Sequence, residues 1–185
     1  MEAAVAAPPR LKINEGVIRL LRGDITELEV GAFVYYAQPD LGLGSGFGGA
    51  IGVRGGASVQ KELSAISAEG PIPTGEAVIT GAGKLKADHI IHAVGPRFRE
   101  LDTESKLRRT MLNCLALAEE EGLETIAFPL MGSGYYGIPP TVSAKVMMEA
   151  ISEHLSGSSG IREVIVSVFD TPQFNAFEAA LAARS

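Results

Sequence analysis

Short apolar runs alternate with longer amphipathic patterns through the second half of this 185-residue chain. A helical pattern over residues 103–122 leads into an apolar run at 125–130, and a second helical pattern over 139–155 leads into a run at 164–169. A last helical pattern begins near residue 171. Alternation of this kind favours a mostly parallel sheet with helices on both faces. The sequence therefore predicts an α/β fold.

The first half of the chain supplies the remaining elements. Apolar, partly β-branched runs predict strands at 17–21 and 32–36, and a helical pattern spans 49–67 with an interruption at two adjacent glycines. Two further strands are expected at 77–80 and 89–94. Because their connection is too short for a crossover helix, we predict that these two strands pair antiparallel.

Length and charge narrow the classes of function. The chain is long enough for one domain with a real core, which we place at 13–185, behind a flexible tail at 1–12 that is rich in Ala and Pro. A net charge of −6 without a basic block argues against binding of duplex nucleic acid. We expect no membrane contact and a cytoplasmic location, since the sequence shows neither a long apolar run nor the features of a signal peptide. The single cysteine, Cys114, lies in an apolar helical pattern and is expected to be a core thiol.

Two glycine-rich stretches, at 41–50 and 131–137, are the strongest functional signal. Each follows an apolar run and precedes a helical pattern. Glycine lets a backbone approach another group closely, and the start of a helix directs free N–H groups at an anion. Both stretches, and Asp170 after the last strand, leave the sheet at the carboxyl ends of strands, where ligands bind in such folds. The alternative is a pair of tight surface loops, but two such loops favour a phosphate-bearing ligand held between them.

The order and spacing of several short motifs resemble the macrodomain family, the ADP-ribose-binding module. The resemblance runs from about residue 17 to residue 181. It implies a three-layer α/β/α sandwich around a mixed, mostly parallel sheet, with ADP-ribose in a cleft on its crest. The motifs that carry the resemblance are Gly23-Asp24-Ile25-Thr26, Gly44-Ser45-Gly46-Phe47-Gly48-Gly49-Ala50-Ile51, Pro73-Thr74-Gly75-Glu76-Ala77, Ile91-His92-Ala93-Val94-Gly95-Pro96, Gly132-Ser133-Gly134-Tyr135-Tyr136-Gly137 and Val168-Phe169-Asp170.

The resemblance also implies roles for single residues. Asp24 would accept a hydrogen bond from the 6-amino group of adenine, and the backbone of Ile25 would contact the base. Phe169 would lie against the adenine face. The alternatives are that Asp24 caps a turn or helix and that Phe169 is plain core.

The two glycine loops would enclose the diphosphate, with one tyrosine of the second loop over the distal ribose and the other packed into the core. The full set of residues assigned to ligand binding is Asp24, Ile25, Gln38, Gly44, Ser45, Gly46, Phe47, Gly132, Ser133, Gly134, Tyr135, Tyr136, Phe169 and Asp170. No metal ligand and no cofactor are expected.

The chain departs from the family where catalytic members carry an Asn-Ala-Ala-Asn run. That run reads Tyr35-Tyr36-Ala37-Gln38 here, and Gly48 stands where mono-ADP-ribosyl hydrolases commonly carry an acidic residue. Gln38 still offers an amide to a ribose hydroxyl. A strand histidine such as His92 or His89 is more often structural than a base. No residue is therefore assigned to catalysis.

Three functions remain open. The first is a module that binds ADP-ribose or a related nucleotide, including one carried on an ADP-ribosylated protein. The second is a hydrolase of ADP-ribosyl esters, O-acetyl-ADP-ribose or ADP-ribose 1″-phosphate. The third is a scaffold that keeps the fold and binds no nucleotide.

Overall fold

The computed structural model describes residues 6–185, which form seven strands, five α-helices and one 3-10 helix. The strands are β1 (Arg10–Ile13), β2 (Gly16–Arg22), β3 (Ala32–Tyr36), β4 (Ala77–Gly81), β5 (His89–Ala93), β6 (Thr125–Phe128) and β7 (Glu163–Val168). The helices are η1 (Ile25–Glu27), α1 (Gly46–Gly55), α2 (Ala57–Ser67), α3 (Thr103–Glu120), α4 (Pro140–Ser156) and α5 (Thr171–Ala182). Within this described part of the chain, no helix has both the length and the apolar character needed to cross a bilayer.

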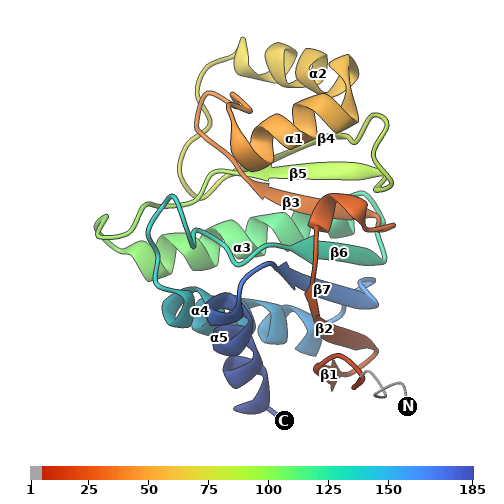
Figure 1. Ribbon diagram of the computed structural model, residues 1–185, viewed down its shortest axis with the longest axis vertical. Helices are drawn as coiled ribbons and strands as arrows, with labels where there is room; N and C mark the ends of the chain where they lie inside the picture. The colour runs from red at the N-terminus through yellow and green to blue at the C-terminus, as the bar shows by residue number, and fades with distance from the viewer. Residues whose placement is uncertain (1–5) are drawn as a thin grey trace.

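All strands belong to one sheet with the order β1-β2-β7-β6-β3-β5-β4, stacked from bottom to top in Figure 1. The five central strands are parallel, whereas β1 pairs with β2 and β4 with β5 in the antiparallel sense. The predicted mixed, mostly parallel sheet and its antiparallel pair are confirmed. Helix α3 connects β5 to β6, and α4 connects β6 to β7 (Figure 1).

Each face of the sheet carries its own hydrophobic core. One core joins the sheet to α3, α4 and α5, and the other joins it to η1, α1 and α2. Side chains alternate between the faces along a strand, so Phe33 enters the second core while its neighbours Ala32 and Val34 enter the first. The three-layer α/β/α sandwich is confirmed.

The predicted tail extends too far into the chain. Residues 10–12 belong to β1, which pairs with β2 from Arg10↔Arg19 to Ile13↔Gly16. The strand is short and its outer face is polar, so the sequence pattern is weak, and the ladder to β2 provides its backbone hydrogen bonds. Residues 1–5 of the predicted tail lie outside the described residues.

The central strands all run in the same direction, so the loops at their carboxyl ends gather at one edge. In Figure 1 the loops that follow β3, β5 and β6 lie together on the left. The predicted helical region at 49–67 is two helices that meet at Gly56, whose φ of 84° is one that glycine adopts readily. Helix α1 also begins earlier than predicted, at Gly46, so the second half of the first glycine-rich stretch is helical.

Candidate functional site

A cleft of about 520 Å³ lies between the two glycine-rich loops, at the carboxyl ends of β3 and β6. Its lining includes most of the residues that the sequence assigned to ligand binding. These are Gln38, Gly44, Ser45, Gly46, Phe47, Gly132, Ser133, Tyr135 and Tyr136. The remaining lining residues are Tyr35, Tyr36, Leu43, Gly48, Pro129 and Leu130.

The first loop presents the start of helix α1 to this cleft. Ser45 is the N-cap residue in extended conformation, and its hydroxyl caps no amide. The first-turn amides have no partner inside the helix, so they are free to donate to a ligand. Gly44 and Gly46 have φ values of 61° and 62°, and a Cβ at either would meet nothing within 4 Å. These glycines keep the backbone open to an approaching anion.

The second loop faces the first with a similar set of donors. Three backbone bonds close it, from Ser133 N to Leu130 O at 3.2 Å, from Gly137 N to Gly134 O at 3.0 Å and from Ile138 N to Gly132 O at 3.0 Å. Within residues 6–185 the amides of Gly134, Tyr135 and Tyr136 donate to no other group.

The Ser133 hydroxyl accepts a bond from Gln173 Nε2 at 3.3 Å, which leaves its own proton free to donate. Gln173 lies in the first turn of α5, so this helix supports the second loop.

Tyr35 and Tyr36 are consecutive on β3 and therefore point to opposite faces of the sheet. Tyr35 enters the core under α1 and α2, where its ring meets the Phe47 ring edge-on at 5.2 Å. Its hydroxyl lies 3.4 Å from Leu43 O. A Cβ at Gly48 would fall well inside van der Waals contact with both oxygens. Tyr35 thus fills the space that any side chain at position 48 would need.

Tyr36 enters the opposite core and supports the second loop. Its hydroxyl donates to Pro96 O, and its ring lies 4.6 Å from that of Tyr136. Tyr136 in turn meets Tyr135 edge-on at 5.2 Å. Of the two loop tyrosines, Tyr136 packs partly on the core, while Tyr135 is 83% exposed at the rim.

Among the described residues that line the cleft, none carries a charge or an imidazole. Burial raises the pKa of Tyr35, Tyr36 and Tyr136, so all three remain neutral phenols near neutral pH. His92 lies outside the lining and is buried on β5, with Nε2 at 2.9 Å from Thr80 Oγ1. Burial lowers the pKa of His92 to about 4. The lining thus offers hydrogen-bond donors and aromatic surface, and the nearby Asp40 carboxylate contributes to the raised pKa of Tyr136, after burial.

The structure does not place every assigned residue in the lining. Ile25 is buried in the core under α1, and its N–H is free because it is the first residue of η1. Gly134 lies within the second loop but does not line the cleft. Phe169 is 69% exposed, which excludes the alternative of a core phenylalanine.

Asp24 and Asp170 both act as caps. Asp24 accepts the amide of Thr26 at 2.9 Å, and Asp170 accepts the amide of Gln173 at 2.7 Å. The two aspartates follow β2 and β7, which are neighbouring strands of the sheet. Their contacts with a ligand remain predictions.

The sequence did not predict a place in the cleft for Leu43, which lies within the first glycine-rich stretch, or for Pro129 and Leu130, which precede the second. The sequence indicates that Tyr35 and Tyr36 replace residues of the family motif, but it did not predict that both line the cleft. The period-two pattern of β3 already sends the two tyrosines to opposite faces, and that was the available signal.

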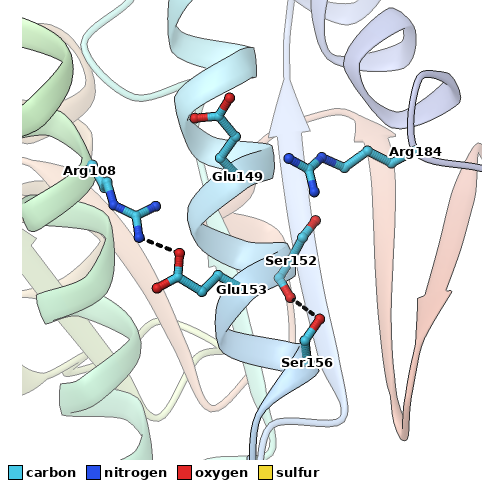
Figure 2. A pocket seen from close by; sticks show the side chains of 6 residues that line it. All are labelled: Arg108, Glu149, Ser152, Glu153, Ser156 and Arg184. Atoms are coloured by element: carbon cyan, nitrogen blue, oxygen red, sulfur yellow. Dashed lines mark hydrogen bonds and ion pairs between the residues drawn. The ribbon is translucent and has the colours of Figure 1, made fainter.

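A second cavity, of about 460 Å³, lies between α3, α4 and the last residues of the chain (Figure 2). Arg108 and Glu153 form an ion pair there, and Glu149 and Arg184 contribute one opposite charge each. Ser152 points its hydroxyl toward Arg184 in Figure 2. Because the charges cancel and no glycine loop faces this cavity, it is poorly suited to a diphosphate.

Comparisons with known proteins are consistent with this arrangement. A family model described as Macro domain matches residues 36–147. The O-acetyl-ADP-ribose deacetylase 2 of Pantoea vagans is 34% identical over 86% of this chain and 95% of its own length. A mutant of the Oceanobacillus iheyensis macrodomain, solved with ADPR, superposes with a TM-score of 0.91 at 27% identity, over 96% of this chain and 98% of that one. The Trypanosoma brucei macrodomain in complex with ADP-ribose gives 0.78 at 25% identity, over 89% and 68%.

Proposed function

Because the chain belongs to the macro domain family, we propose that it binds ADP-ribose or an ADP-ribose derivative in the cleft between its two glycine-rich loops. The observation that carries the proposal is the pair of opposed donor sets. The start of α1 offers free amides from one side, and the second loop offers free amides and the Ser133 hydroxyl from the other. Two rows of donors suit the two phosphates of a nucleoside diphosphate.

The adenine would lie beyond the second loop, where β2 and β7 end. There Asp24 supplies a carboxylate, Ile25 a free N–H and Phe169 an exposed ring. An exposed aromatic ring without a packing role favours stacking on a base. The distal ribose would then lie toward Tyr136 and Gln38, and the exposed Tyr135 leaves room for a protein to which the ADP-ribose is attached.

The chemistry of the lining favours binding over hydrolysis. Hydrolysis at the distal ribose needs a group that takes a proton from water or orients it, usually one whose pKa lies near the working pH. The phenols of Tyr35 and Tyr136 have raised pKa values and stay protonated, and Tyr35 fills the space beside Gly48. The protein is therefore expected to hold its ligand intact.

Calorimetry with ADP-ribose tests the binding proposal. Wild-type protein should give a saturable heat, and Asp24→Ala should weaken binding by about tenfold or more because the base loses its acceptor. Asp88→Ala is the matched control, since Asp88 is an exposed aspartate before β5, at the other edge of the sheet. Absence of heat at millimolar ADP-ribose would reject the proposal and favour the scaffold.

The name of the Pantoea vagans relative makes deacetylation of O-acetyl-ADP-ribose the second candidate. Incubation with that ester and measurement of released acetate separates the two. We expect a rate no higher than that of a Gln38→Ala/Tyr136→Ala double variant, whose cleft lacks two polar groups. A wild-type rate well above that of the double variant would establish an active site.

A further inference from the structure

The Asp24 carboxylate is held in a closed ring of hydrogen bonds. Arg54 Nη1 donates to Asp24 Oδ2 at 2.7 Å and to Thr26 Oγ1 at 2.6 Å. The Thr26 hydroxyl donates to Asp24 Oδ1 at 2.7 Å, and the Thr26 amide donates to the same oxygen at 2.9 Å. The carboxylate is thus fixed on both oxygens, from its own loop and from α1.

The ring leaves a defined acceptor for a ligand. A carboxylate has about four lone-pair positions, two on each oxygen. The two bonds from Thr26 occupy Oδ1, and Arg54 occupies one position on Oδ2. The position that remains on Oδ2 accepts one N–H donor. The 6-amino group of adenine is such a donor, whereas the 6-oxo group of hypoxanthine or guanine is an acceptor and would face the anion.

We propose that Arg54 is the positioning residue for base selection, which holds Asp24 Oδ2 where it accepts the 6-amino group of adenine and rejects a 6-oxo purine. This inference rests on the proposed function. Arg54 itself touches neither phosphate nor base in this assignment. It acts through Asp24.

The position of Arg54 in the fold gives the ring a second effect. Arg54 lies in the last turn of α1, the helix whose first turn forms the diphosphate side of the cleft. The ring therefore ties the base end of the site to the element that binds the diphosphate. Other charges facing Arg54 are few: Glu27 Oε1 lies 3.4 Å from its Nη1, and Lys86 Nζ pairs with Glu27 Oε2 at 3.1 Å.

The electrostatics agree with this geometry. Burial alone would raise the pKa of Asp24, but the hydrogen bonds from Thr26 and Arg54 outweigh it and lower that pKa. Asp24 is therefore an anion throughout the neutral range, and an anion accepts from the adenine amino group without donating to a 6-oxo group.

The test compares two ligands that differ at purine position 6, ADP and inosine 5′-diphosphate, by calorimetry. Wild-type protein should bind ADP more tightly than inosine 5′-diphosphate. Arg54→Ala should reduce the ratio of the inosine diphosphate dissociation constant to that of ADP by about tenfold, because Thr26 then holds Oδ1 alone and Oδ2 can rotate away from its position. Arg54→Lys should restore part of the ratio, since an ammonium group supplies the charge but lacks the planar guanidinium.

Lys86→Ala is the matched control, because Lys86 joins the same charged cluster through Glu27 and makes no bond to Asp24. Its ratio should equal that of the wild type. A merely structural role for Arg54 would weaken both ligands equally and leave the ratio unchanged, which would overturn the inference. A rise in the ratio would also overturn it, because Arg54 would then be a donor to 6-oxo purines. Failure of wild-type protein to bind either diphosphate would instead reject the proposed function.

Discussion

At the scale of single residues, two replacements in this chain fit each other. The resemblance to catalytic macrodomains implies an asparagine where this chain has Tyr35 and an acidic residue where it has Gly48. The phenol of Tyr35 lies where a Cβ at position 48 would have to go. Position 48 is therefore crowded by Tyr35 and by the Leu43 carbonyl together, and a side chain there would have to displace both.

This crowding predicts the effect of one added methyl group. Gly48→Ala should lower the free energy of unfolding by about 1–3 kcal/mol, because its Cβ would force Tyr35 and the Leu43 carbonyl to move. Gly52→Ala is the matched control in the same helix. Its Cβ would make ordinary contact with Leu43 Cδ1 at 3.5 Å, so it should stabilise by about 0.5–1 kcal/mol. Urea unfolding measures both, and equal effects would show that the space beside Gly48 is not filled.

At the scale of elements, α5 holds the second loop in place through one side chain. Asp170 caps the helix through the amide of Gln173, and the Gln173 side chain reaches Ser133. Phe177 and Leu181 fix the same helix to the sheet. The position of the second loop thus depends on the helix cap Asp170, which does not line the cleft.

Substitutions of Asp170 distinguish its role as a helix cap from a direct contact with the ligand. Asp170→Ala should lower the free energy of unfolding by about 1 kcal/mol, because the first turn of α5 loses its side-chain acceptor. Asp170→Asn keeps an acceptor oxygen and should stay close to wild type in both stability and ADP-ribose affinity. Thermal melting and calorimetry measure the two quantities. Loss of affinity in Asp170→Asn at unchanged stability would show instead that the charge of Asp170 contacts the ligand.

At the scale of the whole molecule, burial of one histidine links stability to pH. His92 has an ordinary pKa of 6.5 when unfolded and a pKa of about 4 in the fold. Between these values the unfolded chain binds a proton that the folded protein does not, so stability falls as the pH falls through this window. It is fully present above pH 6.5, and the decline ends near pH 4.

Chemical unfolding at two pH values checks this linkage. From pH 7 to pH 4.5, His92 should account for a loss of about 2–3 kcal/mol in the free energy of unfolding. His92→Gln keeps a hydrogen-bonding group beside Thr80 and does not titrate, so its loss over the same interval should be smaller by that amount. The same loss in both proteins would mean that other groups govern the pH dependence.

The sequence predicts the parts of this fold that depend on local pattern. Apolar periods and short connections were enough for the parallel centre and for the antiparallel pair of β4 and β5, and the glycine stretches indicated the cleft. Strand β1 was missed because four residues with two apolar side chains give almost no pattern. A cytoplasmic location remains a prediction.

Hydrogen bonds between residues distant in the sequence could not be predicted from the local pattern. Arg54 and Asp24 are bonded across η1, β3 and the first glycine loop, and nothing local to either residue indicates the other. The hydroxyl of Tyr36 finds Pro96 only because β3 and β5 are neighbours in the sheet. Such contacts follow from the tertiary arrangement, so they appear only once the strands are in order.

The cleft between the glycine loops is built from dipoles, with no lysine or arginine in its lining among the described residues. Phosphate sites assembled from cations lose affinity as ionic strength rises, because salt screens the attraction between the charges. Amide N–H groups carry only partial charges and act at hydrogen-bond distance, so salt screens their contacts less. The affinity of a diphosphate held here should therefore change less with ionic strength than that of a site lined by lysine and arginine, and titrations at low and high salt would measure the difference.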